Sequence, residues 1–393
     1  MNTPKRNVLI LAVCQGLSVC GLVITTTAFA LCGQVLAEDE ALATIPLGIS
    51  LTANMLMAIP ASFLMAKIGR KIGFSCGQII GMIGGVVALY ALIYEQSFVL
   101  LCISGVFLGA HNAFWQFYRF AAVDTAPIAY RSRAISYVLA GGVVAALLGP
   151  EIAVLTADLF KPIMFAGVFV SFTVLCIINF LVLQLLQIPK NPESWKLLGG
   201  RPLIEIIKKP TFIIAAAAGM VGYGLMVLVM TATPLAMIAC GYTFGDSAFI
   251  IQWHAFAMFA PGFITGHLIK KFGVNKIILS GCVLYLLSMI INLAGLDVHH
   301  FWFGLVLVGI GWNFMFVGGS TLLTDVYTPE EKAKVQAFND FLIFASAAGA
   351  SFASGALQNL IGWDAVNFAV AAPVIAIMLL IYLLKQQNSI LST

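Results

Sequence analysis

The chain has 393 residues, of which 61% are hydrophobic and 9% are charged, and its mean hydropathy is +1.02. A water-soluble domain cannot bury that much apolar surface, so the composition excludes a soluble globular protein and indicates a polytopic membrane protein. The formal net charge is +4, but the basic residues are scattered through loops between apolar stretches. This distribution argues against a nucleic-acid-binding surface.

Twelve stretches of mainly apolar residues follow one another along the chain. Each has about 20 residues or more, which is enough to cross a bilayer as an α-helix. The first stretch is too long for the apolar part of a signal peptide, so we expect it to be retained. The sequence predicts an all-α membrane protein with transmembrane helices at 8–33, 43–66, 72–94, 97–123, 134–157, 163–187, 211–239, 247–269, 275–296, 300–325, 335–358 and 364–385.

The Lys and Arg residues test this count, because successive loops must alternate between the two sides of the membrane. Of the 20 Lys and Arg residues, all except Lys161 and Arg119 fall in loops or termini on one predicted side. The positive-inside rule makes that side the cytoplasm. We therefore expect a multi-pass protein of the inner membrane with both termini in the cytoplasm.

The two halves of the chain share a residue pattern. A polar linker at 188–210 separates an N-terminal six-helix bundle at 1–187 from a C-terminal six-helix bundle at 211–393. The matched residues occur in the same order and direction, which is typical of a parallel repeat with its substrate site near the middle of the membrane, at the interface between the repeats. The matches are Thr25 and Thr27 with Thr231 and Thr233, Gly69 with Gly273, Asn112 with Asn313, and Asp124 with Asp325.

The loops after the second and eighth predicted spans carry related motifs, SFLMAKIGRK at 62–71 and GHLIKKFGVNK at 266–276, and the fifth span contains ALLGP at 146–150. On these motifs the chain resembles the major facilitator superfamily over essentially its whole length. The family pattern for the loop is G-x-L-A-D-R-x-G-R-K, and Ala66 and Lys270 stand here at its acidic position. The resemblance implies a transporter rather than an enzyme, with two pseudo-symmetric six-helix halves and no cofactor.

We assign four charged residues to a cytoplasmic gate: Arg70, Lys71, Asp124 and Asp340. Our hypothesis is that Arg70 or Lys71 contacts Asp340 when the cytoplasmic side is closed. Such a contact combines an ion pair with the negative charge that is favoured near a helix N-terminus. The alternative is that Asp340 only caps the eleventh span.

The fourth span carries polar residues on one helical face. Asn112, Gln116 and Arg119 fall at positions i, i+4 and i+7, and His111 and Trp115 form an adjacent stripe. The resemblance implies that spans one, four, seven and ten line the cavity, so we expect these residues to bind substrate. Arg119 has two alternative roles. It either forms part of an inner gate or contacts an anionic group, or it extends its side chain so that the charge reaches the cytoplasmic membrane surface.

The tenth span repeats part of this pattern, since Trp312 and Asn313 lie at the depth of Asn112. Amides donate and accept hydrogen bonds and aromatic rings offer flat apolar contact, a combination that suits a neutral or weakly charged organic solute with a ring. The alternative for the amides is helix-to-helix hydrogen bonding without ligand contact.

The stretch from Gly222 to Gly266 is apolar but repeatedly interrupted by polar residues. Polar groups and breaks at membrane depth are tolerated only inside protein or against a water-filled cavity, so this stretch predicts part of a transport path. The residues of spans one, seven and eight that we assign to substrate binding are Thr25, Thr27, Tyr223, Met226, Met230, Thr233 and Gln252.

Glu151 and His254 are candidates for proton coupling. They fall at similar predicted depths on spans five and eight, which the resemblance makes neighbours. A buried carboxylate and an imidazole can form a titratable pair. In the alternative, Glu151 reaches the outer surface and His254 bonds a backbone carbonyl.

The predicted function is secondary active transport of a small organic solute by alternating access. Detailed similarity in spans seven, eight and ten to a little-characterised bacterial branch of the superfamily favours uptake of a nutrient, vitamin or siderophore-like metabolite, with protons as the candidate coupling ion. Proton-antiport efflux of drugs or metabolites and a non-transporting membrane receptor remain as alternatives. The expected partners of a monomeric chain are the small-molecule substrate and the lipid bilayer, with no metal and no nucleic acid.

Overall fold

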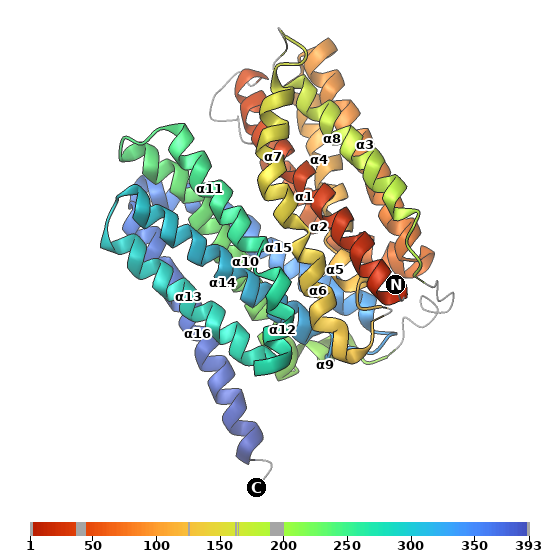
Figure 1. Ribbon diagram of the computed structural model, residues 1–393, viewed down its shortest axis with the longest axis vertical. Helices are drawn as coiled ribbons and strands as arrows, with labels where there is room; N and C mark the ends of the chain where they lie inside the picture. The colour runs from red at the N-terminus through yellow and green to blue at the C-terminus, as the bar shows by residue number, and fades with distance from the viewer. Residues whose placement is uncertain are drawn as a thin grey trace. The chain divides into compact units, whose positions relative to one another are not determined.

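The computed structural model describes residues 3–36, 45–124, 126–161, 163, 165–188 and 200–390, and every regular element in these ranges is helical. Residues 189–199 of the predicted linker lie outside the described ranges. The helices, labelled as in Figure 1, are α1 (Thr3–Leu36), α2 (Ile45–Ile68), α3 (Arg70–Tyr90), the π-helical turn η2 (Ala91–Glu95), α4 (Phe98–Trp115), α5 (Tyr118–Ala121), the 3₁₀ turn η3 (Ile128–Tyr130), α6 (Arg131–Ala140), α7 (Gly142–Ala157), α8 (Ala166–Leu183), α9 (Leu203–Ile207), α10 (Pro210–Ala239), α11 (Phe244–Phe259), α12 (Gly262–Phe272), α13 (Val274–Ala294), α14 (Val298–Leu323), α15 (Lys332–Leu360) and α16 (Trp363–Ile390).

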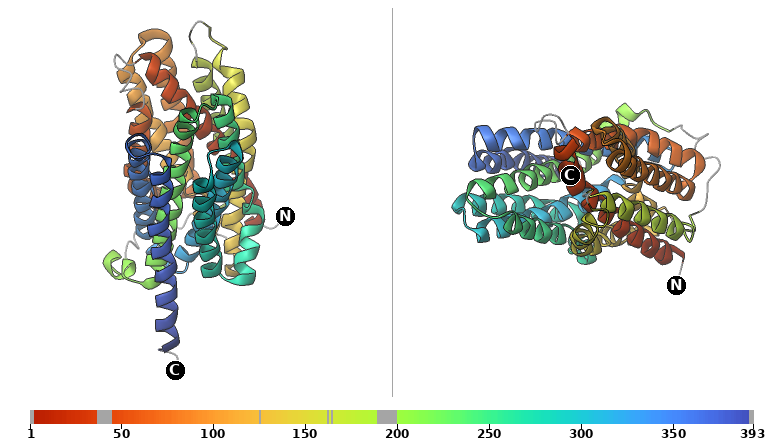
Figure 2. Two further views of the ribbon diagram at one scale, coloured as in Figure 1. Left: turned by 90° about the vertical axis from the view of Figure 1, so that its left-hand side faces the viewer. Right: turned by 90° about the horizontal axis from the view of Figure 1, so that it is seen from above.

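The chain forms two compact units. Unit 1 comprises Met1–Pro127, Tyr137–Gly199 and Lys332–Phe341, and unit 2 comprises Ile128–Ser136, Gly200–Glu331 and Leu342–Thr393. In unit 1, α4 packs against α2 and α3, and in unit 2, α14 packs against α10 and α13 (Figure 1; Figure 2). Two helices, α6 and α15, are divided between the units, so the first ten residues of α15 pack with unit 1 and the remainder with unit 2.

The described chain has ten helices that are long and apolar enough to cross a membrane. A further candidate is the pair Gly245–Phe259 and Gly262–Phe272, whose axes are bent by 41°. The all-α membrane fold is confirmed, but the count of twelve spans is not. The predicted eleventh span lies in α15, which has 29 residues and is not among these ten helices.

Several of the predicted spans are broken within the bundle. The fourth is interrupted between α4 and α5 at Gln116 and Phe117, and the fifth between α6 and α7 at Gly141. A side chain at Gly141 would collide with the backbone carbonyl of Ala12 on α1, so glycine permits the close approach of α1 there. The seventh span behaves differently, because α10 is helical straight through Pro234.

Gly69 and Gly273, which the repeat pairs with each other, have the same backbone conformation. Their φ and ψ angles are 93° and 158° at Gly69 and 88° and 150° at Gly273. Side-chain-bearing residues rarely adopt this region. The equal geometry at equivalent loops supports the parallel repeat and gives a physical reason for glycine in both motifs.

We expect Gly273→Ala to lower the free energy of unfolding by about 1–3 kcal/mol, because alanine is strained at this φ and ψ. A Cβ at Gly273 meets no atom within 4 Å, so the loss reports backbone strain alone. The measurement is thermal unfolding of the detergent-purified protein. The matched control is Gly349→Ala in α15, where a Cβ also meets nothing within 4 Å and the helical backbone favours alanine. Equal melting temperatures for the two variants would contradict the strain argument.

Candidate functional site

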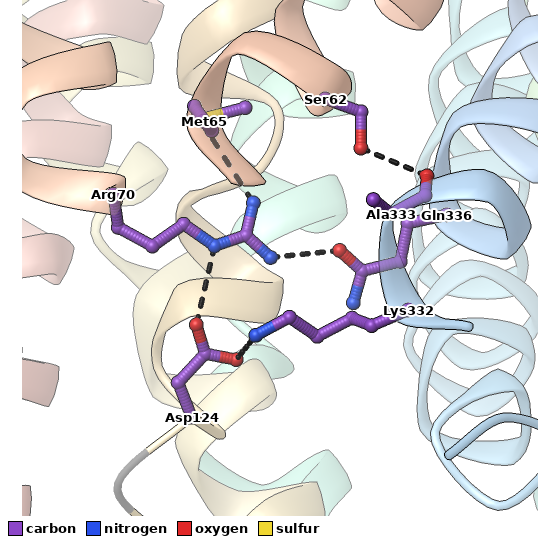
Figure 3. A network of polar contacts seen from close by, with 7 residues as sticks. All are labelled: Ser62, Met65, Arg70, Asp124, Lys332, Ala333 and Gln336. Carbon is purple, nitrogen blue, oxygen red and sulfur yellow. Dashed lines mark hydrogen bonds and ion pairs between the residues drawn. The ribbon is translucent and has the colours of Figure 1, made fainter. Parts of the chain in front are cut away.

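Three charged side chains and one amide of unit 1 lie around the first turn of α15. We call them the Asp124 cluster: Arg70, Asp124, Lys332 and Gln336. The Nε of Arg70 donates to Oδ2 of Asp124 at 3.1 Å, and the Nζ of Lys332 donates to Oδ1 at 2.9 Å. The Nη2 of Arg70 also donates to Oε1 of Gln336 at 2.8 Å (Figure 3). The carboxylate of Asp124 therefore holds the N-terminus of α3 and the N-terminus of α15 together, with one cation on each oxygen.

The local chain path explains why these side chains meet. Gly69 turns the backbone so that Arg70 begins α3, and Asp124 follows directly after the short helix α5. Ser62 on α2 donates to the backbone carbonyl of Ala333 at 2.9 Å and so fixes α15 from a second side (Figure 3).

The electrostatics of the Asp124 cluster favour the ionised carboxylate. Burial alone would raise the pKa of Asp124, but Lys332 and Arg70 outweigh burial and hold that pKa below its ordinary value of 3.8. Burial lowers the pKa of Lys332 from its ordinary value of 10.5, and the charge of Asp124 opposes that shift. With two cations and one carboxylate, the cluster carries a net charge of +1.

A second ion pair, between Arg119 and Asp340, is completely enclosed in unit 1. The Nη2 of Arg119 donates to Oδ1 of Asp340 at 2.5 Å, and the two side chains are 1% and 0% exposed. Arg119 also donates from Nη1 to the backbone carbonyl of Gln116 at 2.7 Å, and its guanidinium lies 4.4 Å from the centre of the Phe120 ring. Asn339 donates to the same Asp340 oxygen at 2.9 Å.

The four residues assigned to the gate do not make the contact that we expected. Asp340 is hydrogen-bonded to Arg119 rather than to Arg70 or Lys71. Arg70 is occupied by Asp124 and Gln336, and Lys71 points away, donating from an exposed position to the carbonyl of Gln184 at 2.7 Å. The break at Gln116 and Phe117 displaces Arg119 from a regular helical continuation of α4, which the spacing argument assumed.

The amide and aromatic residues of α4 pair with one another. The indole Nε1 of Trp115 donates to Oδ1 of Asn112 at 3.0 Å, and both residues are buried. Gln116 is buried at the helix end. His111 faces the interior of unit 1, with its Nδ1 at 3.0 Å from the Gly77 carbonyl. Two of the predicted substrate residues, Trp115 and Asn112, therefore satisfy each other, and His111 serves the contact between α3 and α4.

Unit 2 contains a cluster of aromatic rings, the Trp312 cluster: Tyr223, Phe259, Trp312, Phe316 and Phe344. Trp312 stacks on Phe316 with ring centres 4.9 Å apart and an interplanar angle of 15°. Tyr223 meets Trp312, Phe316 and Phe344 edge-on at 5.6–5.9 Å, and Phe259 meets Trp312 at 5.7 Å. Trp312 is 3% exposed, and its Nε1–H has no hydrogen-bond partner among the described residues. A buried indole donor without a partner is costly, which makes it a feature that a ligand could satisfy.

The other predicted substrate residues of unit 2 are mainly engaged in helix packing. Asn313 is fully buried, accepts from Thr265 at 2.6 Å and donates to the Met258 carbonyl at 2.7 Å. The helix-to-helix alternative therefore describes Asn313. Thr233 donates to the Val229 carbonyl within α10 at 2.7 Å.

The remaining assigned positions are less informative. Met226 is buried, whereas Met230 and Gln252 are half-buried. In unit 1, Thr25 donates to the Gly21 carbonyl within α1 at 2.7 Å. The side chain of Thr27 lies outside the described part of the chain.

His254 makes the backbone contact that our alternative gave it, whereas the depth of Glu151 in the membrane stays a prediction. Glu151 is exposed on α7. His254 is fully buried in unit 2, with its Nδ1 at 2.8 Å from the backbone carbonyl of Leu305. A hydrogen bond of this kind ties α11 to α14, which is a structural role.

An ion pair that the sequence did not reveal lies in unit 2, between Arg201 and Glu331. Arg201 donates from Nε and Nη2 to the two Glu331 oxygens at 2.7 and 2.5 Å, and its backbone N–H also donates to Oε1 at 2.8 Å. These hydrogen bonds hold the pKa of Glu331, which is 1% exposed, well below its ordinary value of 4.5. Glu331 directly precedes α15, so the two acids Glu330 and Glu331 beside Lys332 were the available signal.

Asp325 is the repeat counterpart of Asp124, but its surroundings differ. Arg131 corresponds to Lys332 in the repeat, whereas Val274 stands where the first half has Arg70. With one cation fewer, burial raises the pKa of Asp325 above its ordinary value of 3.8 in spite of Arg131. Both units thus have a carboxylate at this place, and only unit 1 surrounds it with two cations.

We expect Asp124→Asn to lower the free energy of unfolding by about 2–4 kcal/mol at neutral pH, because it leaves the buried Arg70 and the half-buried Lys332 without a carboxylate. Lys332→Met should cost less, since Arg70 keeps its carboxylate. The folded-state pKa of Asp124 lies below its ordinary value, so its stabilising effect is complete above that ordinary value and is lost as the pH falls below it and through the folded-state pKa.

The measurement is thermal unfolding in detergent between neutral pH and pH values in the carboxyl range. The stability difference between the natural protein and Asp124→Asn should shrink on acidification. A difference that is independent of pH, or a larger loss in Lys332→Met, would contradict this account of the cluster.

Comparison with known proteins supplies an independent view of the chain. The family model of the Major Facilitator Superfamily matches residues 11–291 and 241–389. The chain is 41% identical over 383 residues to the riboflavin transporter RfnT of Brucella anthropi, a match that covers 97% of this chain and 96% of that protein. It is 28% identical over 375 residues to the uncharacterised MFS-type transporter YdeG of Bacillus subtilis, covering 91% and 86% of the two chains.

Two solved structures superpose on most of the chain. The human organic anion transporter MFSD10 superposes with a TM-score of 0.78 at 11% identity, covering 97% of this chain and 100% of that chain. The Escherichia coli fucose:proton symporter FucP superposes with a TM-score of 0.75 at 14% identity, covering 97% and 98%. At these identities the likeness concerns the fold alone.

Proposed function

Because the chain belongs to the Major Facilitator Superfamily, we propose that it imports a flat, ring-containing nutrient of the flavin class by alternating access. Two lines of argument support this proposal. A relative that is 41% identical over nearly the whole length carries the name of a riboflavin transporter. The chain also has an aromatic site whose chemistry matches a flat ring system with hydrogen-bond acceptors.

The observation that carries the proposal is the unpartnered Nε1–H of Trp312. Buried polar groups in folded proteins nearly always have a hydrogen-bond partner, so an exception indicates strain or a bound group. This donor lies among four other rings, one of which, Phe316, is stacked on the same indole. A flavin ring offers both an aromatic face for stacking and carbonyl and nitrogen acceptors for an indole donor.

The composition of the Trp312 cluster suits a substrate that must also be released. Its members come from four helices of unit 2, α10, α11, α14 and α15, so a shift of any one helix changes the cluster. Met226 and Met230 lie on α10 close in sequence to Tyr223, and flexible thioethers adapt readily to a changed packing. Aromatic stacking and one neutral hydrogen bond give moderate affinity, as a transporter requires.

The proposal includes the finer features that the sequence predicts. The protein lies in the inner membrane with both termini in the cytoplasm, acts as a monomer, and uses a proton gradient as its driving force. The Asp124 cluster and the Arg119–Asp340 pair belong to the cytoplasmic gate. The distribution of basic residues supports the orientation, and buried ionisable residues within the helices support proton coupling.

We expect Trp312→Phe to raise the KM for riboflavin uptake about 3- to 10-fold, because phenylalanine keeps an aromatic face but loses the N–H donor. The measurement is uptake of radiolabelled riboflavin by a riboflavin-auxotrophic bacterium that depends on this chain. The matched control is Trp302→Phe. Trp302 lies on the same helix, α14, and the Nε1 of its indole also has no hydrogen-bond partner among the described residues. Equal KM values for Trp312→Phe and the natural protein would contradict the assigned role of Trp312.

The direction of transport is tested separately from the site. Import predicts accumulation of riboflavin in right-side-out vesicles when the outside is made acidic. Accumulation only in inverted vesicles with an acidic interior would instead establish proton-antiport efflux. Failure of riboflavin and related ring compounds to be transported or to raise the melting temperature of the purified protein would favour the non-transporting receptor.

A further inference from the structure

We propose that Asp340 is the residue that binds and releases the coupling proton, with Arg119 as its counter-charge. This inference rests on the proposed transport function and assigns its proton coupling to a residue other than Glu151 or His254. It is drawn from the geometry of one carboxylate, from the charges around it, and from the division of α15 between the two units.

The carboxylate of Asp340 is fully buried but only half engaged. Its Oδ1 accepts hydrogen bonds from Arg119 at 2.5 Å and from Asn339 at 2.9 Å. Its Oδ2 is also buried and has no hydrogen-bond partner among the described residues. A carboxylate oxygen of this kind is a natural place for a proton, because an O–H bond can form there while Oδ1 keeps its donors.

The charges that face Asp340 come from two elements besides α15. Arg119 on α5 makes the direct ion pair, and Arg70 at the start of α3 acts on the carboxylate electrostatically from further away. Arg70 is itself hydrogen-bonded to Asp124, which also binds Lys332 at the start of α15. Asp340 therefore depends on a single direct cation, whereas Asp124 has one on each oxygen.

The other carboxylates and the imidazole are less suited to carry the proton. Asp124 and Glu331 are held ionised by their cations, with pKa values below the ordinary range. Glu151 is exposed and lacks the enclosed surroundings of Asp340. His254 uses its Nδ1 on the backbone carbonyl of Leu305. Asp340 combines burial, a spare oxygen and a breakable ion pair.

The position of Asp340 connects its charge to movement of the helix. The segment Lys332–Phe341 packs with unit 1, and α15 continues from Leu342 in unit 2. Any movement of the units relative to each other must therefore bend α15 near Phe341 or separate its first ten residues from unit 1. Asp340 lies one residue before this division, so its ion pair opposes such a separation.

The proton step follows from these contacts. A hydronium ion transfers its proton to Oδ2 of Asp340, which forms an O–H bond and leaves water. The neutral carboxylic acid no longer balances the charge of Arg119, and a buried cation without a counter-charge is unfavourable. The first ten residues of α15 then separate from α5, which hydrates Arg119. When the acid later loses its proton to water on the other side, the ion pair reforms.

The central test uses purified protein in liposomes with three forms: the natural protein, Asp340→Asn, and the double variant Arg119→Gln with Asp340→Asn. We expect both variants to catalyse counterflow of riboflavin, which requires exchange but no gradient. Both should fail to accumulate riboflavin in response to a pH gradient. The double variant guards against misfolding, because it removes the buried positive charge that Asp340→Asn no longer balances. Gradient-driven accumulation by a folded double variant would overturn the proposal.

Glu151→Gln is the control in the same assay, since its side chain is exposed, and it should accumulate riboflavin as the natural protein does. Loss of accumulation in Glu151→Gln together with its retention in Asp340→Asn would assign the proton to Glu151 instead. Absence of counterflow in the natural protein would refute riboflavin as substrate, and the proton proposal would then be decided by a measurement that needs no substrate.

That measurement is the rate of thiol labelling at position 335, which reports whether the first turns of α15 stay packed in unit 1. Val335 is fully buried, so a thiol in Val335→Cys reacts slowly while the first turns of α15 pack with unit 1. Cys240, the exposed cysteine of the described residues, is first replaced by serine. Moving from neutral to mildly acidic pH should speed labelling of the introduced thiol, and Asp340→Asn should make the labelling fast at every pH. Labelling that responds to pH equally in both backgrounds would refute the role of Asp340.

Discussion

The ion pair between Arg119 and Asp340 governs how the start of α15 is held. Both charges are removed from water, so each is acceptable only while the other is present. Two further contacts hold the start of α15. Asp124 joins α3 to Lys332, and Ser62 donates a hydrogen bond to the backbone carbonyl of Ala333. Ten residues of one helix are thus fixed by the ion pairs of Asp124 and Asp340 and by one neutral hydrogen bond from Ser62.

The two halves of the repeat meet the same packing requirement with different chemistry. In unit 2 the segment that contains the start of α6 is held by Ser132 and Ser136, which donate to the backbone carbonyls of Gly266 and Gly262 on α12. These hydrogen bonds are neutral and do not depend on a carboxylate being ionised. The corresponding segment of unit 1 is held by charged side chains. The start of α15 in unit 1 therefore depends on the carboxylates of Asp124 and Asp340, whereas Arg131 at the start of α6 in unit 2 acts on Asp325.

The sequence was sufficient for the fold but not for the orientation of side chains. Apolar length predicted the membrane helices, and the backbone angles of Gly69 and Gly273 agree with the repeat that spacing alone had indicated. The position of Asn313 along its helix could not show that it would bond Thr265, because rotation about the helix axis depends on tertiary packing. The partner of Asp340 was likewise inaccessible, since the break after α4 changes the direction of Arg119. The repeat did single out Trp312, although its unpartnered donor is visible only in three dimensions.

The central claim is that this chain moves a flavin-class ring through an alternating-access cycle. The most direct measurement is counterflow of radiolabelled riboflavin into liposomes that contain the purified protein and an internal excess of unlabelled riboflavin. Our account predicts a transient accumulation of label without any ion gradient, which excess external riboflavin abolishes. Entry of label no faster than into protein-free liposomes, with protein that is folded and inserted, would contradict it.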